Sequence, residues 1–202
     1  MKKGFTLVEM MVAIMIFSIV VVVALAALVK IIDANKKAQT IQDAVVNMSF
    51  TMESMTRELR TGSTYFCTVL APGSDISVTS LSSQSVGPCN GVTGASGQGA
   101  GFAFLSSRSG AGCRLINAYE VVPDSSVSGT FIFKKASQQN CGDALSFTPV
   151  IDTGAVSLTS YYLAVSNTQY PLLFIKLDGA AGNKENIKTY FSIQTAASPR
   201  EP

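Results

Sequence analysis

The pattern of hydrophobic and polar positions divides this chain into a long N-terminal segment and a β-patterned remainder. From Met10 to Val29 every residue is apolar except Ser18, so this segment is apolar on all sides. A helix of that length spans about 30 Å, which is the thickness of one bilayer core. No glycine or proline occurs from Phe5 to Thr61, so we expect one helix over this range, with Gly62 as its C-terminal stop.

The second half of the predicted helix carries an apolar stripe on one face. Its apolar residues recur in steps of four and three, which is the spacing of a single helix face. The stripe consists of Ala34, Ala38, Ile41, Val45, Met48, Met52, Met55 and Leu59. We expect this face to pack on the rest of the protein, and a two-chain coiled coil is the alternative interpretation.

After Gly62 the pattern changes to short β-like runs. Residues 62–101 are rich in Ser, Gly and Thr, and the part from Gly94 to Gly101 is similar to a flexible linker. Strands are predicted at 101–105, 115–122, 129–134, 156–165, 172–177 and 187–194. Residues 178–186 are predicted to form a hairpin loop, and residues 196–202 a disordered tail. Strands that follow one long helix favour an α+β fold, with a small antiparallel β-sheet packed on the helix.

Composition and charge argue against several classes of function. The 202-residue chain has a formal net charge of +2, so no large basic field points to nucleic acid. It contains no histidine, which rules out a Ser-His-Asp triad, and its glycines do not form a phosphate-binding loop motif. We therefore expect neither enzymatic activity nor a cofactor.

The four cysteines, Cys67, Cys89, Cys113 and Cys141, all follow the apolar segment. They form no Cys-x-x-Cys pattern, so a zinc site is not expected. If this part of the chain is exported, two disulfides are the natural interpretation, and four buried free thiols are the other. Three pairings are possible, and we favour Cys67–Cys89 with Cys113–Cys141 because these pairs close the two shortest separate loops.

Few residues in the β-patterned part are candidates for ligand binding. Asp178, Asn183 and Glu185 offer oxygen ligands to calcium, although their spacing is not that of an EF-hand and a solvated turn is the other interpretation. Scattered cations could touch DNA or a polysaccharide, or belong to an ordinary solvated surface. These cations are Arg108, Arg114, Lys134 and Lys135.

A carboxylate stands at the start of the apolar segment, where membrane insertion alone does not explain it. Glu9 costs on the order of 2.5–3.5 kcal/mol inside an apolar helix unless something pairs with it. Lys2 and Lys3 precede the segment, which predicts a cytoplasmic N-terminus and an exported C-terminal part. A plain signal anchor fits the apolar run, and so does a secretory signal cleaved after Ala26. Neither accounts for Glu9.

The stretch Gly4-Phe5-Thr6-Leu7-Val8-Glu9 resembles the processing site of type IV pilins and of the related type II secretion pseudopilins. The resemblance implies that a prepilin peptidase cuts between Gly4 and Phe5 and methylates the new amine of Phe5. It also implies that Glu9 meets that amine on a neighbouring subunit, since a paired buried charge costs much less than an unpaired one. Glu9 would then set the axial register between subunits.

The stretch from Met48 to Arg60, MSFTMESMTRELR, resembles the J-type minor pseudopilin of type II secretion and similar minor pilins. The expected organisation is a leader at 1–4, a transmembrane and filament-core helix at 5–32, an amphipathic helix half at 33–61, an exported β-rich domain at 62–195 and the tail at 196–202.

The resemblance implies a structural, minor subunit of a type II secretion pseudopilus or a type IV pilus. Such a protein spans the cytoplasmic (inner) membrane once before it joins the filament. Its expected partners are other pilin or pseudopilin subunits, the prepilin peptidase, the inner-membrane assembly platform and membrane lipid, and not nucleic acid. Two alternatives stay open, namely a minor pilin that displays an adhesive or DNA-binding domain and a secreted soluble protein cleaved after Ala26.

Overall fold

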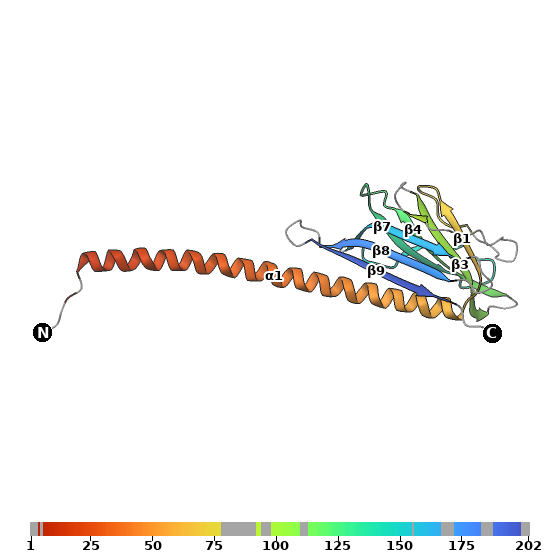
Figure 1. Cartoon of the computed structure of the whole chain (residues 1–202), viewed down its shortest axis with the longest axis horizontal. Coiled ribbons are helices and arrows are strands. Elements are labelled where there is room, and N and C mark those ends of the chain that lie inside the picture. The colour runs from red at the N-terminus through yellow and green to blue at the C-terminus, as the bar shows by residue number, and fades with distance from the viewer. Residues whose placement is uncertain are drawn as a thin grey trace.

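In this computed structural model, one long helix carries a β-rich domain at its C-terminal end (Figure 1). The structure describes Gly4 and residues 6–77, 92–93, 98–109, 113–154, 156–166, 172–182 and 188–198, without the side chains of residues 108 and 109. Helix α1 runs from Leu7 to Thr61 without a break. Its first half extends away from the domain, and its second half lies along the sheet (Figure 1). The predicted long helix and the α+β fold are confirmed.

Helix α1 begins with a side-chain cap at Thr6. Thr6 has extended backbone angles (φ −83°, ψ 150°), and its hydroxyl accepts a hydrogen bond from the backbone N–H of Glu9 at 3.3 Å. Such a cap satisfies one of the N–H groups that the first turn leaves without a partner.

The C-terminal end of α1 is held by Gly62 and Tyr65. The N–H of Gly62 donates to the carbonyl of Leu59 at 3.1 Å, and the Tyr65 hydroxyl donates to the same carbonyl at 2.5 Å. Gly62 is the predicted stop, but its backbone is extended (φ −80°) and does not need glycine. Glycine is required for space, because a Cβ at this position would collide with the ring of Phe104.

Among the described residues, nine strands form one antiparallel sheet. Seven of them lie in the order β1-β3-β4-β5-β7-β8-β9, and the short strands β2 and β6 pair with β7 and β5. Their bounds are β1 Ser63–Leu70, β2 Val92–Thr93, β3 Gly99–Ser109, β4 Arg114–Pro123, β5 Phe131–Ser137, β6 Thr148–Pro149, β7 Val156–Val165, β8 Leu173–Ala181 and β9 Thr189–Ala197. All six predicted strands are present, with shifted ends, although Ile187 lies outside the described residues.

The region after Gly62 is more ordered than its composition predicted. Strand β1 was missed because its Ser and Thr residues hide an alternation in which Tyr65 and Cys67 are buried on one face of the sheet and Leu70 on the other. Residues 99–101 of the predicted linker belong to β3, and residues 94–97 lie outside the described part.

The last two strands are longer than predicted. Strand β8 continues through Asp178 and Gly179 to Ala181, so the hairpin loop begins later than position 178. Gly179 is needed inside the strand, because a Cβ there would come within 2.6 Å of the Ser157 carbonyl oxygen on β7. The tail prediction also began too early, since β9 continues to a buried Ala197, and residues 199–202 lie outside the described part.

The second half of α1 packs on the inner face of the sheet. The buried helix residues are Ala44, Met48, Thr51, Met52, Met55 and Leu59. The apolar residues among them join a core with the buried sheet residues Phe102, Phe104, Tyr119, Phe133, Leu163, Ile175 and Leu177. The predicted stripe is thus confirmed from Met48 to Leu59, and its burial within the chain makes it unavailable to a second chain.

The N-terminal end of the predicted stripe was wrong at Ala34, Ala38 and Val45, whereas Ile41 is half-buried. Val45 is 43% exposed, and its neighbour Ala44 is buried instead. The predicted stripe used an average step of 3.5 residues, whereas a straight helix has 3.6 residues per turn, so the buried face shifts along the helix from Val45 to Ala44. The small side chain of Ala44 lets the helix approach the sheet closely. Ala34 and Ala38 are exposed because the helix has left the sheet at that level (Figure 1).

A smaller core lies on the outer face of β1, β3 and β4. Its buried members are Leu70, Ile76, Ala103, Ile116, Ala118 and Val122. Ile76 covers this face from the segment after β1, and it packs where Gly101 has no side chain. The sheet therefore has apolar contacts on both faces at β1, β3 and β4.

Candidate functional site

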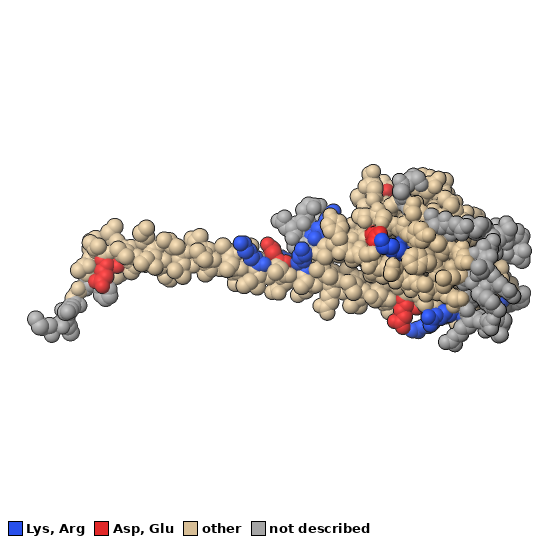
Figure 2. Space-filling view, viewed as in Figure 1, with Lys and Arg blue, Asp and Glu red and all other residues tan. Residues whose placement is uncertain are grey.

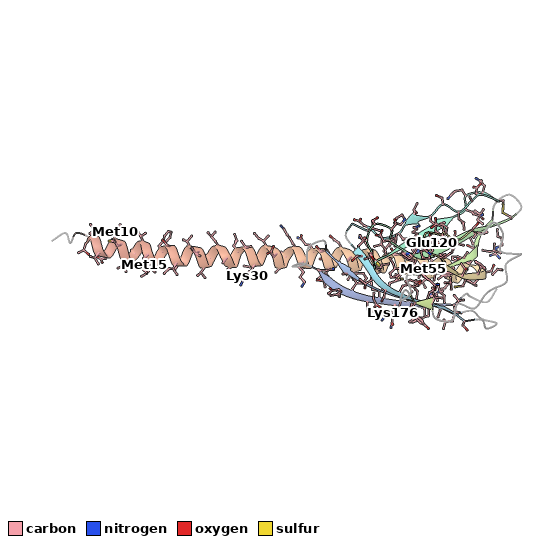
Figure 3. The ribbon with its side chains drawn as sticks, turned by 90° about the horizontal axis from the view of Figure 1, so that it is seen from above. Met10, Met15, Lys30, Met55, Glu120 and Lys176 are labelled. Carbon is pink, nitrogen blue, oxygen red and sulfur yellow. A yellow bond between two sulfur atoms is a disulfide. The ribbon has the colours of Figure 1, made fainter. Side chains whose placement is uncertain are left out.

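The exposed first half of α1 is the most unusual surface of the molecule. Its side chains stand out into open space, as Met10 and Met15 do in Figure 3. Phe17 is 68% exposed and Val22 is 66% exposed. By length and composition, this helix is long and apolar enough to cross a membrane. An apolar surface of this size in a folded protein marks a contact with lipid or with another protein.

Glu9 is the acidic residue at the start of this apolar surface. Figure 2 shows an acidic group near the N-terminal end of the helix, followed on this face by a long stretch without charged side chains. In the sequence that stretch ends at Lys30. Thr6 and Glu9 stand three positions apart, as in a capping box, and a carboxylate in the first turn interacts favourably with the helix dipole. This capping pattern, Thr-x-x-Glu, was readable in the sequence and was missed.

The residues around the predicted processing site are described only in part. Gly4 is exposed, and Thr6 caps the helix, whereas Phe5 and residues 1–3 lie outside the described residues. Among the described residues, no cation lies within ion-pair distance of Glu9. Glu9 is exposed, and its carboxylate has no ionic partner among the residues that the structure describes.

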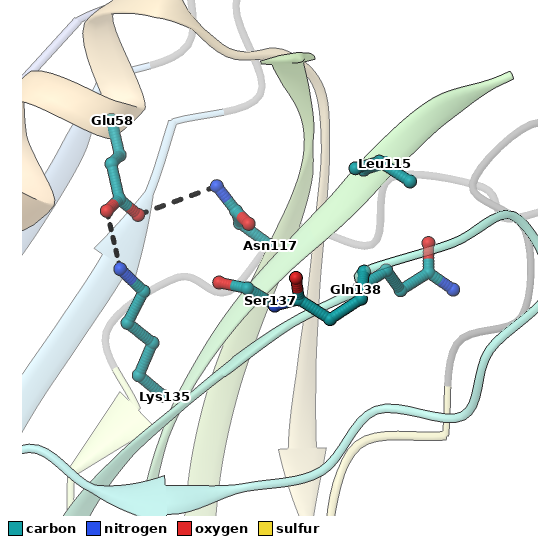
Figure 4. Close-up of a pocket in the computed structure, with 7 residues that line it drawn as sticks. Glu58, Leu115, Asn117, Lys135, Ser137 and Gln138 are labelled. Carbon is teal, nitrogen blue, oxygen red and sulfur yellow. Dashed lines mark hydrogen bonds and ion pairs between the residues drawn. The ribbon is translucent and has the colours of Figure 1, made fainter. Parts of the chain in front are cut away.

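A polar cluster ties the last turns of α1 to the sheet (Figure 4). The carboxylate of Glu58 accepts hydrogen bonds from Lys135 on β5 at 2.5 Å and from Tyr119 on β4 at 2.8 Å, and Asn117 donates at 3.5 Å. Burial raises the pKa of Tyr119, and the negative charge of Glu58 raises it further. The neutral phenol of Tyr119 and the ammonium group of Lys135 both donate to the Glu58 carboxylate. Because Glu58 belongs to α1 and the two donors belong to the sheet, the cluster connects the helix to the sheet.

A small polar cavity opens beside this cluster. Its volume is about 240 Å³, and Leu115, Asn117, Ser137, Gln138 and Gln139 line it together with the Glu58–Lys135 pair. The Glu58 carboxylate and the Lys135 ammonium group at this cavity already form an ion pair with each other (Figure 4). The arrangement fits structural attachment better than catalysis.

A second polar cluster lies on the outer face of the sheet around Glu120, which is 1% exposed. Glu120 accepts a hydrogen bond from the backbone N–H of Ile76 at 3.0 Å, and the Lys134 ammonium lies 3.4 Å from its other oxygen. Burial raises the pKa of Glu120 to about 7. Lys134 also donates to Asp75 at 2.9 Å, which lowers the pKa of Asp75. The cluster holds the segment after β1 against the smaller core, and no sequence pattern predicted it.

The predicted calcium candidates are not brought together in the described residues. Asp178 lies in β8 and accepts a hydrogen bond from Ser160 at 2.9 Å, while Lys176 lies 3.2 Å away. Hydrogen bonding, chiefly from Ser192, lowers the pKa of Asp178. Asn183 and Glu185 lie outside the described residues, and the described part of the chain contains no group of three or more possible metal ligands.

The three cysteines that the structure describes are all disulfide-bonded. Cys113 and Cys141 are bonded, with their Cα atoms 6.1 Å apart, which confirms that pair. Cys67 is also disulfide-bonded. Its predicted partner, Cys89, lies outside the described residues.

Three of the four cations singled out in the sequence make contacts within the domain. Lys134 and Lys135 pair with the carboxylates described above. Arg114 donates to the Ser106 carbonyl at 3.1 Å and to the Ser63 hydroxyl at 2.7 Å. The side chain of Arg108 lies outside the described residues. These contacts give the three cations a structural role.

Comparison with known proteins bears on the N-terminal segment. A family model described as the prokaryotic N-terminal methylation motif matches residues 1–25. No curated protein and no solved structure matches the chain. The matched segment contains Gly4, Phe5 and Glu9 and the first part of the exposed helix. It supports a type IV pilin-like family, and with the apolar helix it fits a membrane-anchored, single-pass protein.

Proposed function

We propose that this chain is a structural subunit of a type II secretion pseudopilus or a type IV pilus. One observation carries the proposal: an N-terminal methylation motif at residues 1–25 includes the start of a helix half whose apolar side chains the protein itself leaves uncovered. In the membrane, lipid covers this surface. In a filament, the helices of other subunits cover it. The work of the protein is then assembly and mechanical coupling, and not catalysis.

Processing after Gly4 is the first step of the proposed pathway. Prepilin peptidase removes residues 1–4 and methylates the new amine of Phe5. The cleavage places a cation at the end of an apolar helix, where an unpaired charge is costly. Glu9 of a neighbouring subunit neutralises this amine, which agrees with the lack of an ionic partner for Glu9 among the described residues.

The finer assignment is a minor subunit whose C-terminal domain is exported. The resemblance of residues 48–60 to a J-type minor pseudopilin supports the minor role. Met52, Met55 and Glu58 of this stretch attach the domain to the helix. The Cys113–Cys141 disulfide supports export, because disulfides persist in oxidising compartments. The inner-membrane assembly platform would then extract the processed protein into the filament.

The experiment that tests this function is mass spectrometry of the N-terminal peptide of the protein isolated from its native host. We expect a chain that begins at Phe5 with a methyl group on its amine. Gly4→Asp should retain the leader and stay out of filaments. Ala26→Leu is the matched control, because it removes the alternative cleavage site and should leave processing unchanged. A chain that begins at Ala27, or at an intact Met1, contradicts the proposal.

A further inference from the structure

We propose that the part of α1 between the apolar helix half and the β-rich domain binds the phosphate groups of anionic phospholipids. The inference rests on the proposed function, because that function places this part of the helix at the surface of the membrane. It goes further by naming the lipid chemistry that holds the protein before assembly. We call residues 30–37, with the sequence KIIDANKK, the neck.

The neck carries three lysines, Lys30, Lys36 and Lys37, and all three are exposed. Figure 3 shows Lys30 on the part of the helix that extends away from the sheet. Figure 2 shows basic groups gathered on the helix between the long stretch without charge and the domain. The three lysines and Asp33 give the neck a formal charge of +2. The neck is therefore a basic surface directly beside the apolar surface.

None of these three lysines has an ion-pair partner among the described residues. Asp33 and Lys37 stand four positions apart, in the order that favours an ion pair on a helix surface, but the structure does not bring them within ion-pair distance. By contrast, Lys134 and Lys135 pair with carboxylates within the domain. The ammonium groups of the neck are therefore available to an outside partner.

The neck begins where the apolar run ends. The run from Met10 to Val29 fills the hydrocarbon core of a bilayer, so Lys30 stands at the edge of that core. Lys36 and Lys37 lie about 9–11 Å farther along the helix axis, and the headgroup layer is about 5–8 Å thick on each side of the core. Because a lysine side chain is long and flexible, its ammonium group can reach back into that layer. All three charges therefore reach the level of the lipid phosphates.

The orientation of the protein in the membrane does not account for these lysines. The basic residues that set the orientation of a membrane helix lie on its cytoplasmic side. In the proposed orientation the neck lies on the exported side, and removal of residues 1–4 leaves no lysine or arginine before Lys30. The processed chain thus carries these cations on the side where the orientation rule does not require them, which indicates a separate role.

The placement of the lysines around the helix favours lipid over a single protein partner. Lys30 and Lys37 are about two turns apart on one side, whereas Lys36 lies about 100° around the helix from Lys37. One neighbouring protein covers one side of the neck, while lipid headgroups surround it. A lysine ammonium binds phosphate as a compact point charge, and each lysine near an anionic membrane surface favours binding by about fivefold.

Contacts with lipid phosphates fix the height of the helix in the membrane and hold the domain just above its surface. Extraction into a filament breaks these contacts, so they oppose the assembly platform. Salt weakens them, because the Debye length falls from about 8 Å at physiological ionic strength to about 3 Å at 1 M.

Electron paramagnetic resonance of spin-labelled lipids tests the contact. The full chain is reconstituted in phosphatidylcholine vesicles that contain a trace of spin-labelled phosphatidylglycerol or of spin-labelled phosphatidylcholine, and the fractions of the two labels that the protein immobilises are compared. We expect a preference for phosphatidylglycerol of roughly two- to fivefold at low salt, which about 1 M NaCl abolishes. Equal association of the two lipids, or a preference that persists at high salt, overturns the proposal.

A pair of double variants tests the assignment to the neck. Lys36→Gln with Lys37→Gln removes two charges from the neck and should reduce the preference to about half or less. Arg57→Gln with Arg60→Gln is the matched control, since it removes two exposed cations from the same helix about 32 Å farther from the bilayer. The control should keep the wild-type preference, and an equal loss in both double variants overturns the assignment.

Photocrosslinking in the membrane fraction of the native host distinguishes lipid from protein as the partner. A photoreactive amino acid replaces Asn35, which is exposed within the neck, and in the control it replaces Thr61, which is exposed at the other end of the helix. We expect phospholipid adducts from position 35 and none from position 61. Adducts from position 35 with protein alone overturn the proposal.

The N-terminal peptide of the wild-type protein separates the two proposals. If the chain begins at Ala27 or at Met1, the proposed function fails, whatever the lipid preference is. If the chain begins at a methylated Phe5 and the two spin-labelled lipids associate equally, the phosphate contact alone fails.

Discussion

The buried carboxylate of Glu120 makes the stability of the β-rich domain depend on pH. Burial raises the pKa of Glu120 from its ordinary value of 4.5 to about 7. Between these values the folded protein holds a proton that the unfolded chain has released. The stabilising effect of the neutral form is therefore complete below pH 4.5 and is lost as the pH rises to 7. A difference of 2.5 pKa units corresponds to about 3 kcal/mol.

Glu120→Gln removes this proton equilibrium and keeps an oxygen that can accept from the N–H of Ile76. We expect the free energy of unfolding of wild type, relative to the variant, to fall by about 3 kcal/mol between pH 4.5 and pH 8. Contributions of groups that do not interact with Glu120 cancel in this comparison, whereas the pKa values of Asp75 and Lys134 respond to Glu120 and belong to the measured difference. The sign of the change is the essential part of the prediction.

The assay is urea denaturation of the full chain in mild detergent, followed by near-ultraviolet circular dichroism across this pH range. Glu53→Gln is the control, because Glu53 is exposed on the helix and should leave the pH profile of wild type unchanged. Parallel profiles for wild type and Glu120→Gln would refute the reasoning, since they would mean that burial does not hold a proton on Glu120.

Three further outcomes are expected. Glu9→Val should be inserted, processed and stable in the membrane but should enter filaments poorly, and normal recovery from purified filaments would contradict its pairing role. Gly179→Ala should destabilise the domain by about 1–3 kcal/mol through overpacking against β7, whereas Gly73→Ala, which has open space but a φ of +78°, should lose about 1–2 kcal/mol in thermal unfolding through backbone strain alone. The non-reduced intact mass should be about four hydrogens below the reduced mass, because Cys67 is disulfide-bonded in addition to the Cys113–Cys141 pair; a difference of two hydrogens would contradict the second disulfide.

The helix and its division into two halves were predictable because they depend on neighbouring residues. A range without glycine or proline forms one helix, and the change from an apolar to a striped pattern separates its two halves, although the sheet begins to cover the helix near Ile41 rather than at Ala34. The strand boundaries were less predictable. Asp178–Gly179 has the composition of a turn, yet Gly179 lies within a strand because the backbone of β7 passes too close for a side chain.

The polar clusters were not predictable, because their members are far apart in the sequence. Glu58 meets Lys135 across 77 positions, and Glu120 meets the segment of Ile76 across 44. Before the strand order and register are known, each of these residues has the same character as any surface charge. Their burial, and the raised pKa of Glu120, are consequences of the sheet.

The sequence by itself determined the N-terminal motif, the apolar helix and the stripe from Met48 to Leu59, because covalent order and helical periodicity are local properties. Only the tertiary structure decided which carboxylates are buried, which cysteine pairs with Cys113 and which apolar side chains stay uncovered. Phe50 illustrates the difference. Its exposure depends on which side of α1 the sheet occupies, and that side is selected by packing between residues that the sequence keeps far apart.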